Sequence, residues 1–413
     1  MKQRKKIFIG NTDVASILSD LKIAFAELGI ETITVMDSET SVLDRCEVDY
    51  KFIDYKRFWF GGVRPRSLQK WLQERQHIEK RVWRKAIKEC DIFIFIWSTF
   101  KFDYSDLAEL KGLGKKVFFL FCGDDARWYY AAKQEYEYYG LKVIEYDENY
   151  DYSIKGLEAR LRRVRLAERY SDFIFSRLDQ AQLELRPYYR YHMWVDSKLI
   201  KHQPSQRQDN PIVAHAPSHR LLKGTSYVLD AFKRLQSEGI SFTPILIENT
   251  PNRKALEIYA DADIVIDQLI ITGTGKLASE ALAAGCVVMA HMAYEKYPQN
   301  NPLECPIIDV NSENIYESLK SIILDYDKRV KLAGRGRDYV LRHLDVRNFC
   351  RKILNLSDGH NLPYDYIPEF FRNRFIPESE ESIPIYNKWN ESVNQTEWYS
   401  NYVKPGQRSG LNF

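Results

Sequence analysis

The sequence predicts an α/β protein of two Rossmann-like domains that face each other across a cleft, followed by a C-terminal tail rich in aromatic residues and proline. Two successive runs of alternating strand and helix patterns indicate the domains. A polar stretch, KHQPSQRQDNP at 201–211, separates the runs and is the predicted linker. The 413 residues exceed the usual size of one hydrophobic core. We expect an N-terminal domain at 1–205, a C-terminal domain at 206–357 and an extension at 358–413.

Short apolar runs alternate with longer helical patterns in the first half. KIFIG at 6–10 leads into a helical pattern that ends at Gly29. The near-continuous apolar character of runs such as DIFIFIW is typical of strands covered on both faces, as in a parallel sheet flanked by helices. Further strands are predicted at 31–36, 91–97, 115–122, 171–176 and 188–194, with a helix at 153–170.

The alternation restarts after the linker, which predicts a second sheet flanked by helices. Strands are predicted at 211–216, 242–248, 263–269, 286–290 and 306–310, and helices at 225–239, 252–262, after 275, near 312–325 and at 327–354. The tail that follows carries many Tyr, Phe and Trp residues, which is unusual for disorder. We expect it to lie along the body as an irregular strap with only its last residues loose.

Composition excludes several classes of protein. Apolar residues make up 45% and charged residues 28%, and the apolar runs are too short to cross a bilayer. The short apolar part of the N-terminus argues against a secretory signal, so we expect a cytoplasmic protein. A net charge of +3 does not suggest nucleic-acid binding. The cysteines form no CxxC pair or Cys/His cluster, which predicts reduced thiols and no metal site: Cys46, Cys90, Cys122, Cys286, Cys305 and Cys350.

A glycine-spaced turn, ITGTGKLASEALAAG at 271–285, runs into a small-residue helix. Gly273 and Gly275 would let the backbone approach a ligand, and the N-terminal end of the helix favours an anion such as a diphosphate. Glu280 lies about one turn into the helix, where an acceptor-only carboxylate suits the two hydroxyls of a ribose. The alternative is a tight turn before a packed helix, with Glu280 solvated.

Two cations follow the first strand of the same half. Arg220 and Lys223 lie in IVAHAPSHRLLKGTSYVLDAF, before a helix capped near Thr225 or Ser226. Both side chains would face the cleft of the glycine turn and could neutralise a departing pyrophosphate. Taken singly, each cation would more often be a solvated surface charge than a ligand contact.

With these motifs, residues 210–345 resemble the donor-binding domain of GT-B glycosyltransferases of the large family-four, "group one" type. APSHRLLKGTSYVLDAF and ADADIVIDQL…GTGKLASEALAAGCVVMA are similar to a bacterial cell-envelope branch of that family. The resemblance implies glycosyl transfer from a nucleotide-diphosphate sugar, with Glu280 on the ribose and Arg220 and Lys223 on the diphosphate. It also implies a retaining reaction that uses neither a metal nor a cofactor.

The sequence departs from that pattern at two positions. The family commonly has a first glutamate eight residues before the second, and Thr272 stands there; Thr272, Thr274 or Lys276 would take over part of its contact with the donor sugar. The usual arginine lies six residues before the lysine, where this chain has Pro217, so Arg220 would act from another place on the loop. Residues 248–251 are the expected neighbours of the nucleobase.

The first half offers weaker candidates for the acceptor side. KKVFFLFCGDDARW at 115–128 is similar to the HGxDxR stretch of many relatives, with Cys122 in the place of histidine. Asp125 or Arg127 would orient an acceptor hydroxyl or a donor phosphate, although a helix cap and a surface salt bridge explain them as well. Gly10, in IGNTD, would permit close approach of a sugar or phosphate.

Two stretches combine arginines with aromatic or helical patterns. YKRFWFGGVRPR at 55–66 has the mixture that suits an anionic membrane surface, or it is a cleft-side loop with buried aromatic residues. ARLRRVRLAERY at 159–170 carries five arginines that form either a solvated face or a contact with acidic lipid: Arg160, Arg162, Arg163, Arg165 and Arg169.

These observations predict a hexosyltransferase-type glycosyltransferase, cytoplasmic and peripheral to the inner membrane, that adds a sugar to an envelope glycan or lipid-linked acceptor. A sugar-nucleotide 2-epimerase would need carboxylates and histidines around the sugar in both domains, and the histidines near the expected cleft strands are His215, His219 and His291. The missing glutamate and the histidine-to-cysteine change leave open a donor-binding scaffold without turnover. A nucleic-acid partner is not expected.

Overall fold

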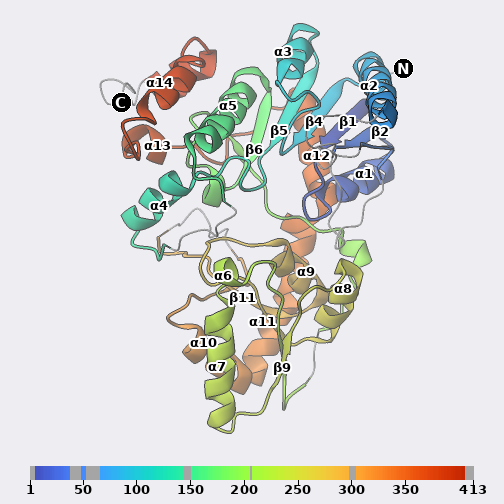
Figure 1. The fold of residues 1–413 in the computed structure, drawn as a ribbon. Coiled ribbons are helices and arrows are strands. Elements are labelled where there is room, and N and C mark those ends of the chain that lie inside the picture. The colour runs from blue at the N-terminus through green and yellow to red at the C-terminus, as the bar shows by residue number, and fades with distance from the viewer. Residues whose placement is uncertain are drawn as a thin grey trace.

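The computed structural model describes residues 5–37, 48–52, 66–143, 150–204, 207–296 and 304–404; for 66–75 it describes the backbone alone. The described chain forms two Rossmann-like α/β domains, each built on its own parallel sheet (Figure 1). This confirms the fold class predicted from the two runs of strand and helix patterns.

The first sheet has seven strands in the order β3-β2-β1-β4-β5-β6-β7. Its strands are β1 (Lys6–Asn11), β2 (Glu31–Met36), β3 (Tyr50–Lys51), β4 (Ile92–Ile96), β5 (Lys116–Leu120), β6 (Phe173–Ser176) and β7 (Tyr189–Arg190). The helices of this half are α1 (Ile17–Glu27), α2 (Arg66–Glu89), α3 (Ser105–Gly112), α4 (Tyr129–Tyr138) and α5 (Ile154–Tyr170). Strand order reverses between β1 and β4, which is where doubly wound sheets open a crevice for ligands.

The second sheet has five strands in the order β12-β11-β10-β8-β9. Its strands are β8 (Ile212–His215), β9 (Thr243–Leu246), β10 (Ile264–Ile266), β11 (Val287–Ala290) and β12 (Ile308–Asp309). The helices are α6 (Arg220–Lys223), α7 (Thr225–Ser237), α8 (Asn252–Asp261), α9 (Lys276–Ala284), α10 (Ile315–Leu324) and α11 (Tyr326–Tyr339). Here the order reverses between β8 and β10, and the loops after these strands face the first domain.

The last helix of the second half returns to the first domain (Figure 1). The expected helix at 327–354 is interrupted: α11 ends at Tyr339, a π-helical turn spans Val340–Leu344, and α12 spans Val346–Ser357. The side chain of Asp345 caps α12 by accepting from Arg347 N at 2.9 Å. The sequence placed residues 346–357 in the second domain, but their apolar face is buried in the core of the first.

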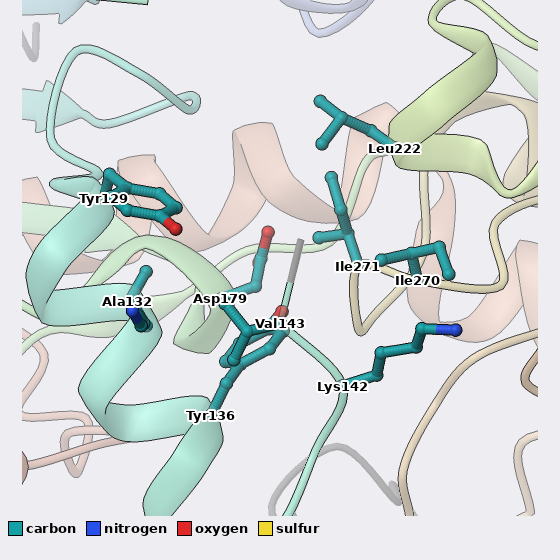
Figure 2. Close-up of a pocket in the computed structure, with 10 residues that line it drawn as sticks. Tyr129, Ala132, Tyr136, Lys142, Val143, Asp179, Leu222, Ile270 and Ile271 are labelled. Atoms are coloured by element: carbon teal, nitrogen blue, oxygen red, sulfur yellow. The ribbon is translucent and has the colours of Figure 1, made fainter. Parts of the chain in front are cut away.

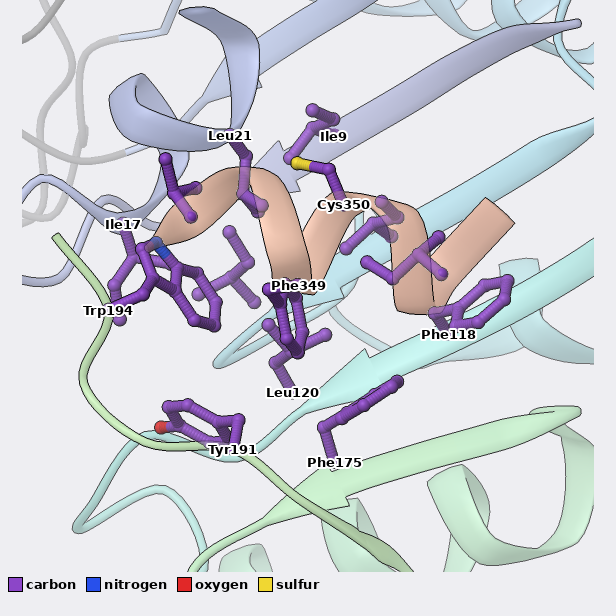
Figure 3. Close-up of a cluster of buried hydrophobic side chains, with 14 of the residues drawn as sticks. Ile9, Ile17, Leu21, Phe118, Leu120, Phe175, Tyr191, Trp194, Phe349 and Cys350 are labelled. Atoms are coloured by element: carbon purple, nitrogen blue, oxygen red, sulfur yellow. The ribbon is translucent and has the colours of Figure 1, made fainter. Parts of the chain in front are cut away.

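Figure 3 shows how α12 completes this core. The Phe349 ring stacks on Trp194 with centroids 4.2 Å apart and meets Phe175 edge-on at 4.9 Å. Cys350 is fully buried beside residues of β1 and α1. The strongly amphipathic pattern of α12 therefore finds its apolar partner across the domain boundary.

Two chain segments cross between the domains side by side. Val195 N donates to Leu344 O at 2.9 Å, and Val346 N donates to Val195 O at 3.0 Å. The Arg347 guanidinium then ties this pair to α1 and to the first crossing, since it binds Glu27 and Asp196. The Arg347 and Lys198 hydrogen bonds hold the pKa of Glu27 at about 2.

The C-terminal extension packs on the outer side of the first domain. Instead of an irregular strap, it contains α13 (Phe370–Asn373), α14 (Ile383–Glu391) and a π-helical turn at Tyr399–Val403. Phe371 and Tyr386 join Trp128 and Leu157 in one apolar cluster, which attaches the extension to α5 and the start of α4. Residues 405–413 lie outside the described chain.

The five arginines of α5 do not share a face. Arg165 is fully buried and binds Glu168 and Asn390, while Arg160 donates to Asp124 O at 3.0 Å and Arg163 to Asp125 O at 2.7 Å. These side chains hold the surrounding loops and the extension, so the expected common basic surface is wrong. Of the other basic-aromatic stretch, 55–66, residues 55–65 lie outside the described chain.

Free thiols are present at five described cysteines, of which Cys90, Cys286 and Cys350 are buried; Cys46 lies outside the described chain. None of the described helices combines the length and the apolar character that crossing a membrane requires.

Candidate functional site

A cleft of about 670 Å³ lies between the two domains at the carboxyl ends of their strands. The first domain contributes residues 12–16, Trp97 and Met193. The second contributes the segments after β8 and β9 and the first turns of α8 and α9: Ala216, Pro217, Ser218, Lys223, Ile247, Asn249, Thr250, Asn252, Ala255, Tyr259, Gly275, Lys276, Leu277 and Glu280. Ionisable side chains on the second-domain wall could therefore bind a charged ligand.

Glu280 lies on this wall with only 4% of its surface exposed. Asn252 Nδ2, at the first residue of α8, donates to Glu280 Oε1 at 3.0 Å and fixes the carboxylate. Burial, followed by the charge of Glu280, raises the pKa of the neighbouring Tyr259. A held carboxylate at the edge of a ligand-sized cleft is suited to accept hydrogen bonds from hydroxyl groups.

Lys223 and the glycine turn meet at a buried carboxylate, Asp267. Lys223 Nζ binds Asp267 Oδ1 and donates to Gln268 Oε1 at 2.9 Å, while Gly275 N donates to Asp267 Oδ2 at 2.9 Å. A Cβ at position 275 would lie 3.0 Å from both Asp267 Oδ2 and Lys223 Nζ. Glycine at 275 therefore allows the turn, the lysine and the aspartate to approach closely.

Lys276 makes an ion pair across the domain boundary. Its Nζ donates to Asp20 Oδ2 of α1 at 2.6 Å and to Trp194 O at 2.7 Å. The Asp20 side chain is fully buried and that of Lys276 is 11% exposed. Since α9 begins at Lys276, this pair attaches the start of α9 to the first domain.

Arg220 does not line the cleft. Its guanidinium makes two parallel bonds to Glu248, from Nε at 2.7 Å and from Nη2 at 2.6 Å, and its side chain is 59% exposed. The pairing raises the pKa of Arg220 and lowers that of Glu248. The two cations that the sequence placed together are thus separated: Lys223 faces the cleft, and Arg220 lies at the surface.

The residues before Gly275 face α4 of the first domain. Tyr136 OH bonds Thr272 Oγ1 and accepts from Thr272 N, both at 3.1 Å, and Thr272 is 1% exposed. Gly273 has a φ of +87°, and a Cβ there would lie 3.3 Å from Arg177. Figure 2 shows this junction, where Tyr129, Tyr136 and Asp179 face Ile270, Ile271 and Leu222 around a small cavity of about 20 Å³.

The positions of Thr272 and Thr274 give no support to their expected roles on the donor sugar, whereas Lys276 lines the cleft. Thr272 is engaged by Tyr136 and Lys276 by Asp20. Thr274 is half-buried and is absent from the described cleft lining.

Asp125 is fully buried, and its side chain binds backbone groups of its own turn after β5. Its carboxylate accepts from Cys122 N at 3.0 Å and from Gly123 N at 2.6 Å, and burial raises its pKa to about 6. Removal from water also raises the pKa of the Cys122 thiol. Neither side chain is among the described cleft residues, so the turn shows Asp125 in the role of a cap. Arg127 pairs with Asp124 and Asp179.

Gly10 lies within β1, buried against Phe8 and Val35. The segment that follows it, residues 12–16, is the part of this strand end that lines the cleft. There Asp13 accepts from Leu18 N at 2.9 Å and from Ser19 Oγ at 2.8 Å, which orders the start of α1.

Histidine does not contribute to the described cleft lining. His215 Nδ1 bonds Ile266 O at 2.8 Å and Nε2 bonds Thr225 Oγ1 at 2.9 Å; burial lowers its pKa. His219 accepts from Leu222 N at the start of α6. Among the described residues, no group of three or more His, Cys, Asp or Glu side chains is placed to hold a metal ion.

Three residues of this site were not selected from the sequence. Asp267 ends an apolar strand pattern immediately before the glycine turn, which is a signal that could have identified it. Asn252 follows Pro251 at a helix start and carries a weaker signal. Asp20 lies 256 positions from its partner Lys276, in the first turn of an ordinary amphipathic helix, and no sequence pattern indicates their contact.

No protein-family model matches the sequence, and no curated protein matches it. Solved structures do match over most of the chain. Sucrose-phosphate synthase from Thermosynechococcus elongatus superposes with a TM-score of 0.56 at 13% identity, covering 86% of this chain and 99% of that chain. HepE from Anabaena, solved in complex with UDP, gives 0.52 at 14% identity, covering 86% and 100%.

WaaG, a glycosyltransferase involved in lipopolysaccharide biosynthesis, gives a TM-score of 0.50 at 13% identity, covering 86% of this chain and 100% of that chain. Together these similarities show that the chain has the GT-B fold, with two facing Rossmann-like domains. At such low identity they establish the fold, and the family-four assignment and the envelope branch stay predictions.

Proposed function

We propose that this protein is a glycosyltransferase that moves a hexosyl unit from a nucleotide-diphosphate sugar to a glycan or lipid-linked acceptor. One observation carries the proposal: Glu280 and Lys223 line the same interdomain cleft, on either side of the glycine turn. Sugar-nucleotide chemistry needs an acceptor for ribose hydroxyls and a cation for the diphosphate, and these two residues supply both. The GT-B fold, shared with glycosyltransferases, supports the same reading.

Lys223 can serve the diphosphate while it stays paired with Asp267. An ammonium group has three N–H donors, and the structure uses two of them, on Asp267 and Gln268. The third would donate to a phosphate oxygen and stabilise the charge that develops there as the glycosidic bond breaks. Asp267 holds the lysine in place and reduces its net charge, so we expect Lys223 to act mainly through this oriented hydrogen bond.

The finer parts of the proposal rest on the resemblance stated above. We propose a retaining reaction with no metal or cofactor, in envelope polysaccharide synthesis at the cytoplasmic face of the inner membrane. The involvement of WaaG in lipopolysaccharide biosynthesis supports the envelope assignment. Of the expected stretch 248–251, Asn249 and Thr250 line the cleft, as does Ile247 just before it, and these three are the proposed neighbours of the nucleobase.

A donor-binding protein without turnover is the second candidate. The Asp125 carboxylate is buried in its own turn. Of the carboxylates that line the described cleft, Asp13 accepts from Leu18 N and Ser19 Oγ and Glu280 accepts from Asn252, so both already have partners. Sugar transfer or slow hydrolysis of a nucleotide sugar by the purified protein separates the two candidates.

The test of the donor site is calorimetric titration of the full chain with UDP, GDP and ADP and with their sugars. For the nucleotide that binds, Glu280→Ala should weaken affinity about 30-fold, because roughly 2 kcal/mol of charge-assisted hydrogen bonding to the ribose is lost. Glu257→Ala, on the exposed side of α8, is the matched control and should leave affinity unchanged. Equal affinity of Glu280→Ala and the native chain would reject the assigned pocket.

A further inference from the structure

A second interdomain cavity lies over the carboxyl ends of β11 and β12. Its volume is about 450 Å³, within the roughly 300–1,000 Å³ typical of small-molecule sites. It shares no lining residue with the cleft: the segment between β10 and α9 contributes Leu269 to this cavity and Gly275 to the cleft. We call it the β11–β12 cavity.

Both domains build the β11–β12 cavity, and lysines cross between them at its edge. Lys296 Nζ donates to Gly140 O at 2.7 Å, and Lys142 Nζ donates to Tyr227 OH at 2.6 Å. Figure 2 shows Lys142 on the segment that follows α4, reaching toward the second domain. The walls are therefore fixed by contacts between the domains.

His291 is the buried polar group of this cavity. It lines the cavity with 5% of its surface exposed, and its Nδ1 bonds Ile270 O at 3.0 Å. A carbonyl oxygen can only accept, so Nδ1 carries the hydrogen, and in a neutral ring Nε2 is then a hydrogen-bond acceptor. Burial lowers the pKa of His291, which keeps the ring neutral. Within the described part of the chain, no group pairs with Nε2.

The backbone of His291 links this acceptor to the glycine turn. His291 N donates to Gln268 O at 2.7 Å, and His291 O accepts from Gly273 N at 2.9 Å. Gln268 in turn accepts from Lys223 in the cleft. A ligand held at Nε2 would thus lie on a wall that is rigidly connected to the proposed donor site.

The lining favours a neutral ligand with many hydroxyl groups. The lining contains two lysines, Lys142 and Lys296, and three carboxylates: Glu295, Asp309 and Glu313. The wall therefore has no excess of positive charge that would attract a phosphate. Asn311, Ser312 and Asn314 add amide and hydroxyl groups of the kind that bind sugar hydroxyls. The Asp309 carboxylate accepts three backbone N–H bonds and shapes the wall after β11.

We propose that the β11–β12 cavity binds a neutral saccharide unit, with one of its hydroxyls donating to His291 Nε2. On the proposed function, this unit belongs to the acceptor glycan and holds it beside the donor cleft. His291 is a binding residue here, and the saccharide it holds need not be the one that reacts.

The test uses saturation-transfer NMR on the full chain with the methyl glycosides of glucose, galactose, mannose, N-acetylglucosamine and rhamnose. At least one glycoside should bind. His291→Asn should weaken that binding about tenfold, since the asparagine amide can still donate to Ile270 O while the acceptor at Nε2 is lost. His291→Gln, which places an amide oxygen near Nε2, should retain more of the binding.

A second variant covers the case in which His291→Asn does not fold. Ser312→Trp, on the partly exposed wall, should fill the cavity and abolish glycoside binding while UDP affinity stays unchanged. Three results would each overturn the proposal. The first is that none of the five glycosides binds. The second is that a glycoside binds equally to the native chain, to His291→Asn and to Ser312→Trp, and the third is that UDP displaces the glycoside competitively. Glycoside binding and UDP binding are measured separately, and neither requires sugar transfer. If UDP does not bind but a glycoside does, the proposed donor site fails and the saccharide site stands. If UDP binds but no glycoside does, the saccharide site fails.

Discussion

The turns after β5 and after β10 both contain a fully buried aspartate that accepts backbone N–H bonds, yet the two aspartates differ in what they hold. Asp125 accepts from Cys122 and Gly123 of its own turn. Asp267 accepts from Gly275 and from Lys223, two segments that meet only at the cleft. A buried carboxylate without a paired cation closes a loop, whereas one paired with a lysine can place a charged donor at a ligand site.

The largest expected effect comes from making the second turn resemble the first. Lys223→Met removes the cation and leaves Asp267 buried with only its Gly275 bond, which should cost about 3–5 kcal/mol of unfolding free energy in urea titration. The double variant Lys223→Met with Asp267→Asn should recover most of this loss. Lys254→Met breaks an exposed pair with Glu257 and serves as the control. A double variant no more stable than the single one would contradict the pairing.

Titration of Asp125 gives the next effect. Its folded pKa of about 6 lies above the ordinary value of 3.8, so the folded state binds the proton more tightly. Its stabilising contribution is therefore complete below about pH 4 and is lost as the pH rises through 6, by at most about 3 kcal/mol.

Asp125→Asn removes that loss, so the unfolding free energy of the variant minus that of the native chain should rise between pH 4 and pH 6. Asp106, whose pKa burial also raises to about 6, contributes equally to both proteins and cancels. The measurement is urea unfolding at several pH values. A difference that stays constant over this range would show that Asp125 does not titrate there.

The ion pair between Lys276 and Asp20 joins α9 to the first domain, and we expect a smaller coupling free energy from it. A double-mutant cycle with Lys276→Met and Asp20→Asn should give about 1–3 kcal/mol, because both side chains are largely buried. Unfolding free energies of the four proteins provide the value. Strictly additive effects would mean that the two residues act independently.

Arg220→Ala should have the smallest effect. Its guanidinium is exposed and bound to Glu248 outside the cleft, so UDP affinity should change less than about threefold. Calorimetric titration beside Glu280→Ala gives the comparison. A loss as large as that of Glu280→Ala would place Arg220 on the diphosphate after all, as the resemblance implied.

Sequence periodicity predicted the parallel sheets because strands covered on both faces leave a continuous apolar signal, as in β4 and β5. Lys223 and Glu280 were predicted to face one cleft because loops at strand ends meet at one edge of a sheet, and both line it, while their roles on a ligand stay predictions. The domain that α12 joins could not be predicted, because an amphipathic pattern shows which face is buried and not what covers it. The same holds for Lys276, whose charge is visible in the sequence and whose partner is not.

The paired backbone of Val195 and Asp345 has a consequence for how the molecule can move. Since the polypeptide passes between the domains twice and the two passages are bonded to each other, they form a single pivot rather than two independent tethers. A rotation about that pivot that widened the crevice would have to separate Lys276 from Asp20. A chain cleaved near residue 345 would lose both the pivot and the helix that fills the first core.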